Sequence, residues 1–162
     1  MKKLFLFLLL SFIGKAAALE TPDESMLLVE KAYVRATIPG TSHSSSYMEI
    51  ENKGKSTITL LGASSKASPR IEIHQHTMVD GMMRMRKINS IDIKPNERVK
   101  LQPSGLHLML FDVEKPLKAQ QSIELTLNFS NNVSVTIPTS VYSPAQERKA
   151  QKMMPNTHEH HH

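Results

Sequence analysis

The stretch HQHTMVDGMMRMRKI, residues 74–88, predicts a β-hairpin around which the rest of the chain can be placed. Its centre is Asp80-Gly81, a pair typical of a two-residue turn because both central positions need positive φ. The register that follows opposes Val79 to Met82, Met78 to Met83, Thr77 to Arg84, His76 to Met85, and His74 to Lys87. Side chains alternate across a strand. One face of the hairpin therefore carries His74, His76, Met78, Met83 and Met85.

A second segment, LHLMLFD at residues 106–112, repeats this alternation of soft ligands. Its leucines predict a core-facing side, so His107 and Met109 point together to the other side. If that side meets the hairpin, two histidines and one or two methionines converge. Imidazole suits copper and zinc, and thioether sulfur selects Cu(I). The chain has no cysteine, so we expect a soft-metal site that works where a thiol would be oxidised.

The remaining sequence predicts an all-β domain. Short β-branched and apolar runs alternate with turn residues, which indicates an antiparallel β-sandwich or barrel. The expected strands are 27–38, 46–52, 57–65, 70–78, 91–93, 98–102, 106–113, 122–129 and 133–138. Residues 41–46 read as a polar Ser/Thr/Gly loop, and residues 144–154 as a turn or two of helix. We find no internal repeat and no second domain.

The first 18 residues are typical of a secretory signal peptide. Lys2 and Lys3 precede an apolar run that ends at Ile13, and Ala16–Ala18 offer a cleavage site. The run is shorter than the ~20 residues that span a bilayer, so we expect no stable membrane insertion after cleavage; an uncleaved anchor is the alternative. Without a cysteine after the run, we expect no bacterial lipid attachment. Residues 19–27 are polar and expected to be loose.

The last twenty residues, 143–162, are expected to form a flexible tail rich in Met and His. Its imidazoles predict a weaker Cu(II) site at His158, His160, His161 and His162. A purification tag is the alternative reading of this run.

Charge and composition exclude several classes of function. The formal charge is +5, from 20 basic and 15 acidic residues, but removal of the signal would leave 17 basic residues and a charge of +2. Sparse aromatics and the lack of a dense basic block argue against nucleic acid. A blue-copper electron carrier is excluded because it needs a cysteine thiolate, and the chain has no cysteine. We expect no enzyme, and we assign the serines after His43 to a loop.

The residues described so far resemble the PCu(A)C family of periplasmic copper chaperones. The family signature, His-x10-Met-x21-His-x-Met, falls without a gap on His74, Met85, His107 and Met109. The matching blocks are VRATIPG at 34–40, YMEIENKG at 47–54, DGMMRMR at 80–86 and PSGLHLMLFDVEKPL at 103–117.

This resemblance implies a cupredoxin-like β-sandwich over about residues 28–142 and a Cu(I) site made by those four residues. The hairpin register, however, opposes Met85 to His76 rather than to His74, so we expect His76 as a neighbour or auxiliary ligand. The resemblance also implies copper delivery toward the Cu(A) subunit of cytochrome c oxidase, or to another copper-handling assembly protein, in the periplasm of a Gram-negative bacterium. A copper tolerance or storage protein without an acceptor is one alternative, and a plain interaction module is the other.

Overall fold

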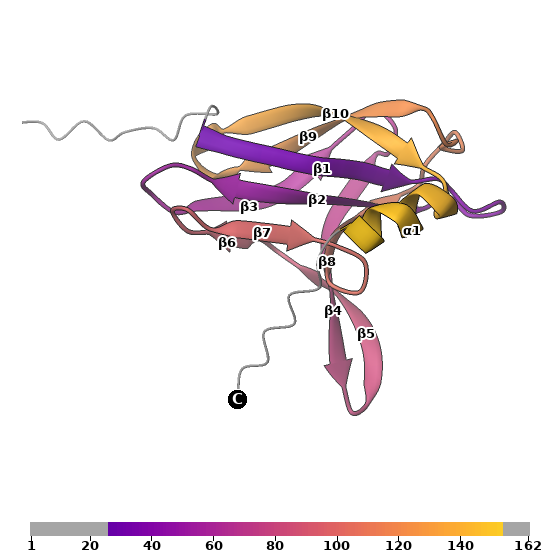
Figure 1. Ribbon diagram of the computed structural model, residues 1–162, viewed down its shortest axis with the longest axis horizontal. Coiled ribbons are helices and arrows are strands. Elements are labelled where there is room, and N and C mark those ends of the chain that lie inside the picture. The colour runs from indigo at the N-terminus through magenta and orange to yellow at the C-terminus, as the bar shows by residue number, and fades with distance from the viewer. Residues whose placement is uncertain (1–25, 154–162) are drawn as a thin grey trace, which may run out of the picture.

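Residues 26–153 are described by the computed structural model, and their ten strands join into one mixed sheet that folds over on itself (Figure 1). The strands are β1 (Leu27–Arg35), β2 (Ser44–Asn52), β3 (Ile58–Ser64), β4 (Arg70–Val79), β5 (Met82–Ile88), β6 (Ile91–Ile93), β7 (Arg98–Leu101), β8 (Leu106–Phe111), β9 (Ser122–Phe129) and β10 (Ser134–Tyr142). A 3₁₀ turn (Ser130–Asn132) and helix α1 (Pro144–Met153) complete the described residues. The all-β prediction is confirmed.

The order of the strands across the sheet is β5-β4-β8-β7-β2-β1-β10-β9-β3-β6, with an additional pairing between β8 and β2. Most neighbours are antiparallel, as expected, but β7 pairs in parallel with β8 through Leu101 and Leu106, and β1 runs parallel to β10. These two strands come from opposite ends of the domain, so no hairpin fixes their relative direction. The sheet is therefore mixed: the expected antiparallel pairing holds for the other neighbours but not for these two pairs.

The core lies between the inner faces of the folded sheet. Its largest fully buried side chains include Met48, Leu60, Leu101, Leu108 and Leu125. Leu108 and Leu110 are both fully buried, which confirms that the leucines of β8 face the core. At ~25 cal/mol per Å² of apolar surface, this burial is the main force holding β8 in place. The side chains of His107 and Met109, on the opposite side of β8, therefore also have a fixed direction.

The serines after His43 are strand residues, which corrects the expectation of a loop through residue 46. Ser44 and Ser46 are buried in β2 and donate hydrogen bonds to the backbone carbonyls of Arg35 (2.6 Å) and Tyr33 (3.1 Å). Those bonds offset the cost of burying a hydroxyl. Small side chains also suit β2 where it pairs with both β1 and β8.

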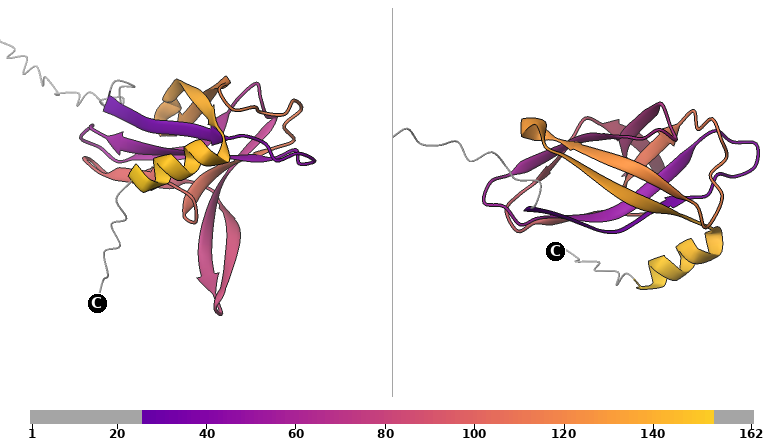
Figure 2. Two further views of the ribbon diagram at one scale, coloured as in Figure 1. Left: turned by 45° about the vertical axis from the view of Figure 1, so that its right-hand side comes forward. Right: turned by 90° about the horizontal axis from the view of Figure 1, so that it is seen from above.

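Hairpin β4–β5 extends away from the body of the sheet (Figures 1 and 2). Its turn has positive φ at Asp80 (52°) and Gly81 (74°), and the pairing runs from Val79 opposite Met82 down to Ile73 opposite Ile88. Each opposed pair expected from the Asp-Gly turn is confirmed. The base of β4 pairs with β8, whereas its tip has only β5 as a neighbour.

Helix α1 is longer than the turn or two expected, so residues 144–153 are not part of the flexible tail expected over 143–162. Ser143 and Gln146 form a capping box: the Gln146 amide donates to Ser143 Oγ (3.3 Å), and the Ser143 amide donates to Gln146 Oε1 (2.9 Å). Pro144 suits the first helical position. The buried Glu147 accepts a 2.9 Å hydrogen bond from Arg35 Nε, which ties the helix to β1. Within the part of the chain described, no helix is long and apolar enough to span a membrane.

Candidate metal centre

Three strands bring the four signature residues to the same side of the sheet. On the pairing of β4 with β8, His74 lies opposite His107, and Met109 lies opposite Glu72. On the pairing of β4 with β5, Met85 lies opposite His76. Opposed residues in a pair of strands project to the same face. The inner side of the same strands, with Ile73 and Leu108, faces the core, so the face that carries the candidate ligands points away from it.

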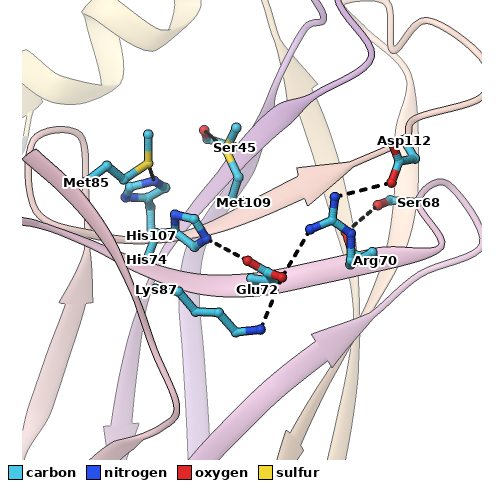
Figure 3. A network of polar contacts seen from close by, with 10 residues as sticks. All are labelled: Ser45, Ser68, Arg70, Glu72, His74, Met85, Lys87, His107, Met109 and Asp112. Atoms are coloured by element: carbon cyan, nitrogen blue, oxygen red, sulfur yellow. Dashed lines mark hydrogen bonds and ion pairs between the residues drawn. The ribbon is translucent and has the colours of Figure 1, made fainter.

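His107 and Met85 make the closest contact of this set (Figure 3). His107 Nε2 lies 3.2 Å from Met85 Sδ. The other ring nitrogen, Nδ1, lies 3.2 Å from the carbonyl oxygen of Gly105 and donates its proton there. In the neutral ring, the lone pair of Nε2 therefore points to the methionine sulfur. Both atoms are donors that soft metals accept.

Burial favours the neutral form of His107, which is the form that binds a metal ion. The side chain is almost fully buried (2% exposed). Burial lowers the pKa of the His107 imidazole from its ordinary value, outweighing the hydrogen bond to Gly105, and the nearby His76 and His74 lower it further. A metal binds the neutral imidazole, so protons compete less at this position than at an exposed histidine.

His74 is oriented by a carboxylate that the sequence analysis missed. Its Nε2 lies 2.9 Å from Glu72 Oε2, and Lys87 and Arg70 also donate to Glu72 at 3.1 Å each (Figure 3). The hydrogen bond from His74, followed by that from Lys87, lowers the pKa of the Glu72 carboxyl to about 2. Alternation along β4 places Glu72 on the side of His74, so the i, i+2 spacing was the signal that could have revealed it.

The remaining nitrogen of His74 has no partner. Nδ1 is buried and makes no hydrogen bond. An unpaired buried nitrogen is costly, and a metal-binding histidine usually donates its other nitrogen to a carboxylate or carbonyl. His74 has that arrangement, with Glu72 in the role of the carboxylate. A soft metal would satisfy the orphaned nitrogen.

His76 shares several of these properties. Its ring stacks on that of His107 with centroids 5.0 Å apart, compared with 5.9 Å for the pair His74 and His107. Its Nδ1 is also buried without a partner. His74 on β4 thus lies opposite His107 on β8, and His76 on β4 lies opposite Met85 on β5. Both histidines adjoin the contact between His107 and Met85.

Met109 lies two residues beyond His107 on the same side of β8. The hydroxyl of Ser45 on β2 is 3.7 Å from its sulfur and donates to it. This bond holds the thioether beside β2. On its other side, Met109 lies opposite Glu72 of β4. Met109 is therefore on the candidate face, with its sulfur occupied by a weak donor that a metal could displace.

Aromatic side chains enclose the site on the side of the body. Tyr47 lies 6.3 Å from His107 and Phe111 lies 5.7 Å from His74, measured between ring centroids. Arg35, which holds helix α1 through Glu147, lies over the Tyr47 ring at 5.5 Å. The hairpin side is open, since Met85 is 47% exposed.

The described histidines and carboxylates do not by themselves form a three-ligand metal site, so the methionine sulfurs are the additional donors. Among residues 26–153, no group of three or more His, Asp or Glu side chains is placed to hold a metal ion. A site of two imidazoles and one or two thioethers has only neutral donors, which favours a soft monovalent ion. The expected signal peptide, and the tail histidines His158, His160, His161 and His162, lie outside the described residues.

Comparisons with known proteins agree with this fold. The family model described as "Putative lipoprotein LpqE-like" matches residues 27–141. "Putative lipoprotein Lxx21020" from Leifsonia xyli subsp. xyli is 30% identical over 136 residues, or 81% of each chain. The structure "Copper-bound PCuAC domain from PmoF2" has a TM-score of 0.63 at 25% identity, covering 74% of this chain and 94% of that one. The structure of Cu(I)-bound DR1885 from Deinococcus radiodurans has a TM-score of 0.57 at 26% identity, covering 68% and 74%.

Proposed function

Since this chain belongs to the LpqE-like family and has the fold of PCuAC domains, we propose that it is a copper chaperone that holds Cu(I) with His74, Met85, His107 and Met109. His76 serves as a neighbour or auxiliary ligand of this set. The support from relatives is that solved structures of this fold, at 25–26% identity, are named as copper-bound and Cu(I)-bound.

The observation that carries the proposal is the contact between His107 Nε2 and Met85 Sδ at 3.2 Å. Two polarizable donors from different strands face each other, and the second nitrogen of His107 is already engaged by Gly105. The orphaned Nδ1 of His74 adds a third donor in need of a partner.

The donor set also suits release. Neutral imidazole and thioether ligands leave Cu(I) with its single positive charge, and the chain has no thiolate to hold it more tightly. Met85 is exposed at the open side, so an acceptor ligand can approach the ion while His107 still binds it. The copper stays Cu(I) throughout this exchange of ligands, and no electron is transferred.

The acceptor that we propose is the Cu(A) subunit of cytochrome c oxidase or another copper-handling assembly protein. For the rest of the chain we propose an exported, periplasmic protein with a signal peptide over residues 1–18, a loose segment up to β1, a copper-binding domain that runs from β1 to helix α1, and a Met- and His-rich tail after α1. The tail histidines, His158 and His160–His162, would form a weaker Cu(II) site.

The direct test is anaerobic Cu(I) titration against a competing chelator, with X-ray absorption to count sulfur and nitrogen ligands. We expect a tight first equivalent with mixed sulfur and nitrogen ligation. Met109→Leu should lower the affinity, whereas Met48→Leu, the same change at a buried core methionine, should not. Equal affinity in wild type and Met109→Leu would contradict the ligand set.

A second measurement separates delivery from storage. The Cu(I)-loaded protein is mixed with an isolated oxidase Cu(A) domain, and both are analysed for copper after separation. Transfer supports a chaperone. Copper retained by the loaded protein would favour a tolerance or storage role with the same site.

A further inference from the structure

Side chains that can bind a soft metal continue past Met85 toward the tip of hairpin β4–β5. Met78 and Met83 lie directly opposite each other, one pair beyond His76 and Met85. Opposed side chains on one face of a hairpin have Cβ atoms ~5 Å apart, close enough for two thioethers to meet one ion. Neither methionine is among the four signature residues.

These two methionines are not core residues. Met78 is 66% exposed and Met83 is 56% exposed, although methionine ordinarily fills gaps inside proteins. Four of the seven large hydrophobic side chains exposed among the described residues are methionines of this one hairpin, namely Met78, Met82, Met83 and Met85. Packing does not account for sulfur at these positions.

The two faces of the hairpin differ in chemistry. The face of Met78 and Met83 continues inward to His76, Met85 and then His107. The opposite face carries Met82, with Arg84 and Arg86 paired to Thr77 and Gln75. Cations on the second face disfavour a metal ion there, while the first face has only neutral soft donors over these two pairs.

His76 supplies an independent sign of a missing ligand. Its Nδ1 is buried and makes no hydrogen bond. His76 is two residues from Met78 on the same side of β4, and it lies opposite Met85. His76 therefore lies between the outer pair of methionines and the inner site in the strand register, and it has an unpaired nitrogen.

We propose that Met78 and Met83, with His76 as third donor, form an outer Cu(I) site through which the ion enters and leaves the inner one. The inner site rests on the proposed function, but the outer site can be tested separately. It has fewer donors and greater exposure than the inner site, so it binds more weakly and exchanges faster. Cu(I) moves inward as Met85 and His107 replace Met78 and Met83, with no change of charge or oxidation state.

The test uses the full chain with ¹³C-methyl-labelled methionine and anaerobic Cu(I) titration followed by NMR. We expect the Met85 and Met109 methyl signals to shift with the first equivalent, and those of Met78 and Met83 with the second. The matched control is Met82, which is as exposed as Met83 (56% each) but lies on the other face. Its methyl signal should not follow the second equivalent.

Variants then test the role in exchange. The double variant Met78→Leu/Met83→Leu should lose the second equivalent and release inner-site Cu(I) to a chelator at least ~10-fold more slowly, a barrier change of about 1.4 kcal/mol. Its affinity for the first equivalent should be unchanged. Met82→Leu should behave as wild type in both measurements.

The possible outcomes are distinct. If Met78 and Met83 do not respond to Cu(I), or if Met82→Leu slows release as much as the double variant, the outer site is overturned. If the methyl signals of Met78 and Met83 respond to Cu(I) but those of Met85 and Met109 do not, the outer site stands and the proposed function fails. If the double variant instead loses only the ability to transfer copper to a partner, with both equivalents retained, the hairpin is a docking surface and the outer site is again overturned.

Discussion

The imidazole of His107 meets the sulfur of Met85 at 3.2 Å, although the two residues are 22 positions apart in the sequence. They come together because β4 pairs with β5 on one edge and with β8 on the other. The site therefore depends on β4 as the strand between its two halves. Residues of β4 that are not ligands, Glu72 above all, consequently affect the ligands on either side.

The first prediction concerns the coupling of His107 and Met85. Each of Met85→Leu and His107→Gln should weaken Cu(I) binding by more than the ~10–100-fold typical of an outer-shell partner. The double variant should be weaker by clearly less than the product of the two effects, because both residues bind one ion. Competition titration measures all three affinities. His43→Gln, at an exposed histidine outside the site, is the control, and strict additivity would show that the two residues do not share an ion.

The second prediction concerns Glu72 as a positioning residue for His74. Glu72→Ala removes the acceptor for His74 Nε2, and we expect Cu(I) affinity to fall ~10–100-fold with the fold retained. Glu72→Gln, which still offers a carbonyl oxygen, should recover part of the loss. The nitrogen signals of His74 in NMR report its tautomer and should change only in the alanine variant.

Lys87→Gln provides the control for this prediction. Lys87 also bonds Glu72, but the variant leaves the contact between Glu72 and His74 in place. If Lys87→Gln lowers the affinity as much as Glu72→Ala, the effect comes from charge at the hairpin and not from the orientation of His74.

The third prediction is a pH dependence of stability. Glu49 is 4% exposed; burial tends to raise its pKa, but the hydrogen bonds from Lys31 and Arg98 outweigh burial and the pKa is lowered. A carboxyl whose pKa is lowered on folding stabilises the protein above its unfolded pKa of about 4.3. That contribution is lost as the pH falls through the folded value.

Glu49→Gln should therefore destabilise the protein at pH 7 by ~1–3 kcal/mol, with a smaller difference at pH 3. Urea unfolding at both pH values measures the free energies. The control is Glu114→Gln, an exposed glutamate for which the structure shows no ion pair. A difference for Glu49→Gln that does not shrink in acid would assign its effect to packing and not to charge.

The fourth prediction concerns the attachment of helix α1. Removal of the Glu147 carboxylate leaves Arg35 without its partner, and breaking such a pair in a part-buried setting should cost ~1–3 kcal/mol. Glu147→Gln should increase amide hydrogen exchange in α1 more than in β1. Arg148→Gln, at the next and exposed position of the helix, should leave exchange unchanged. Equal exchange in the two variants would show that other contacts hold the helix.

The local rules predicted the hairpin well. The Asp80-Gly81 turn has one favoured geometry, so its register followed directly and is confirmed. The alternation in β8 likewise placed Leu108 in the core and His107 on the opposite face, beside His74. The resemblance to the PCu(A)C family is confirmed by the solved structures of the same fold. The assignment of individual ligands stays a prediction.

Features that depend on distant pairing could not be read locally. The parallel pairing of β1 with β10 joins residues more than a hundred positions apart. Ser44–Ser46 look like a loop by composition, and only the neighbouring strands β1 and β8 make them strand residues. The ion pair of Arg35 with Glu147 also spans the chain. Glu72 differs from these cases, since strand alternation alone placed it beside His74.

The two-residue turn at Asp80-Gly81 also determines which residues of β5 can reach the metal site. The number of residues from the turn alone decides whether a residue of β5 lies on the face of Met83 and Met85 or on the face of Arg84 and Arg86. Deletion of Met82 with the turn retained would bring Arg86 opposite His76 and move Met85 to the opposite face. The same donors would then all be present in the chain, yet a guanidinium would stand where the sulfur now meets His107. The metal site thus depends on the spacing between turn and ligand as strictly as on the ligand itself.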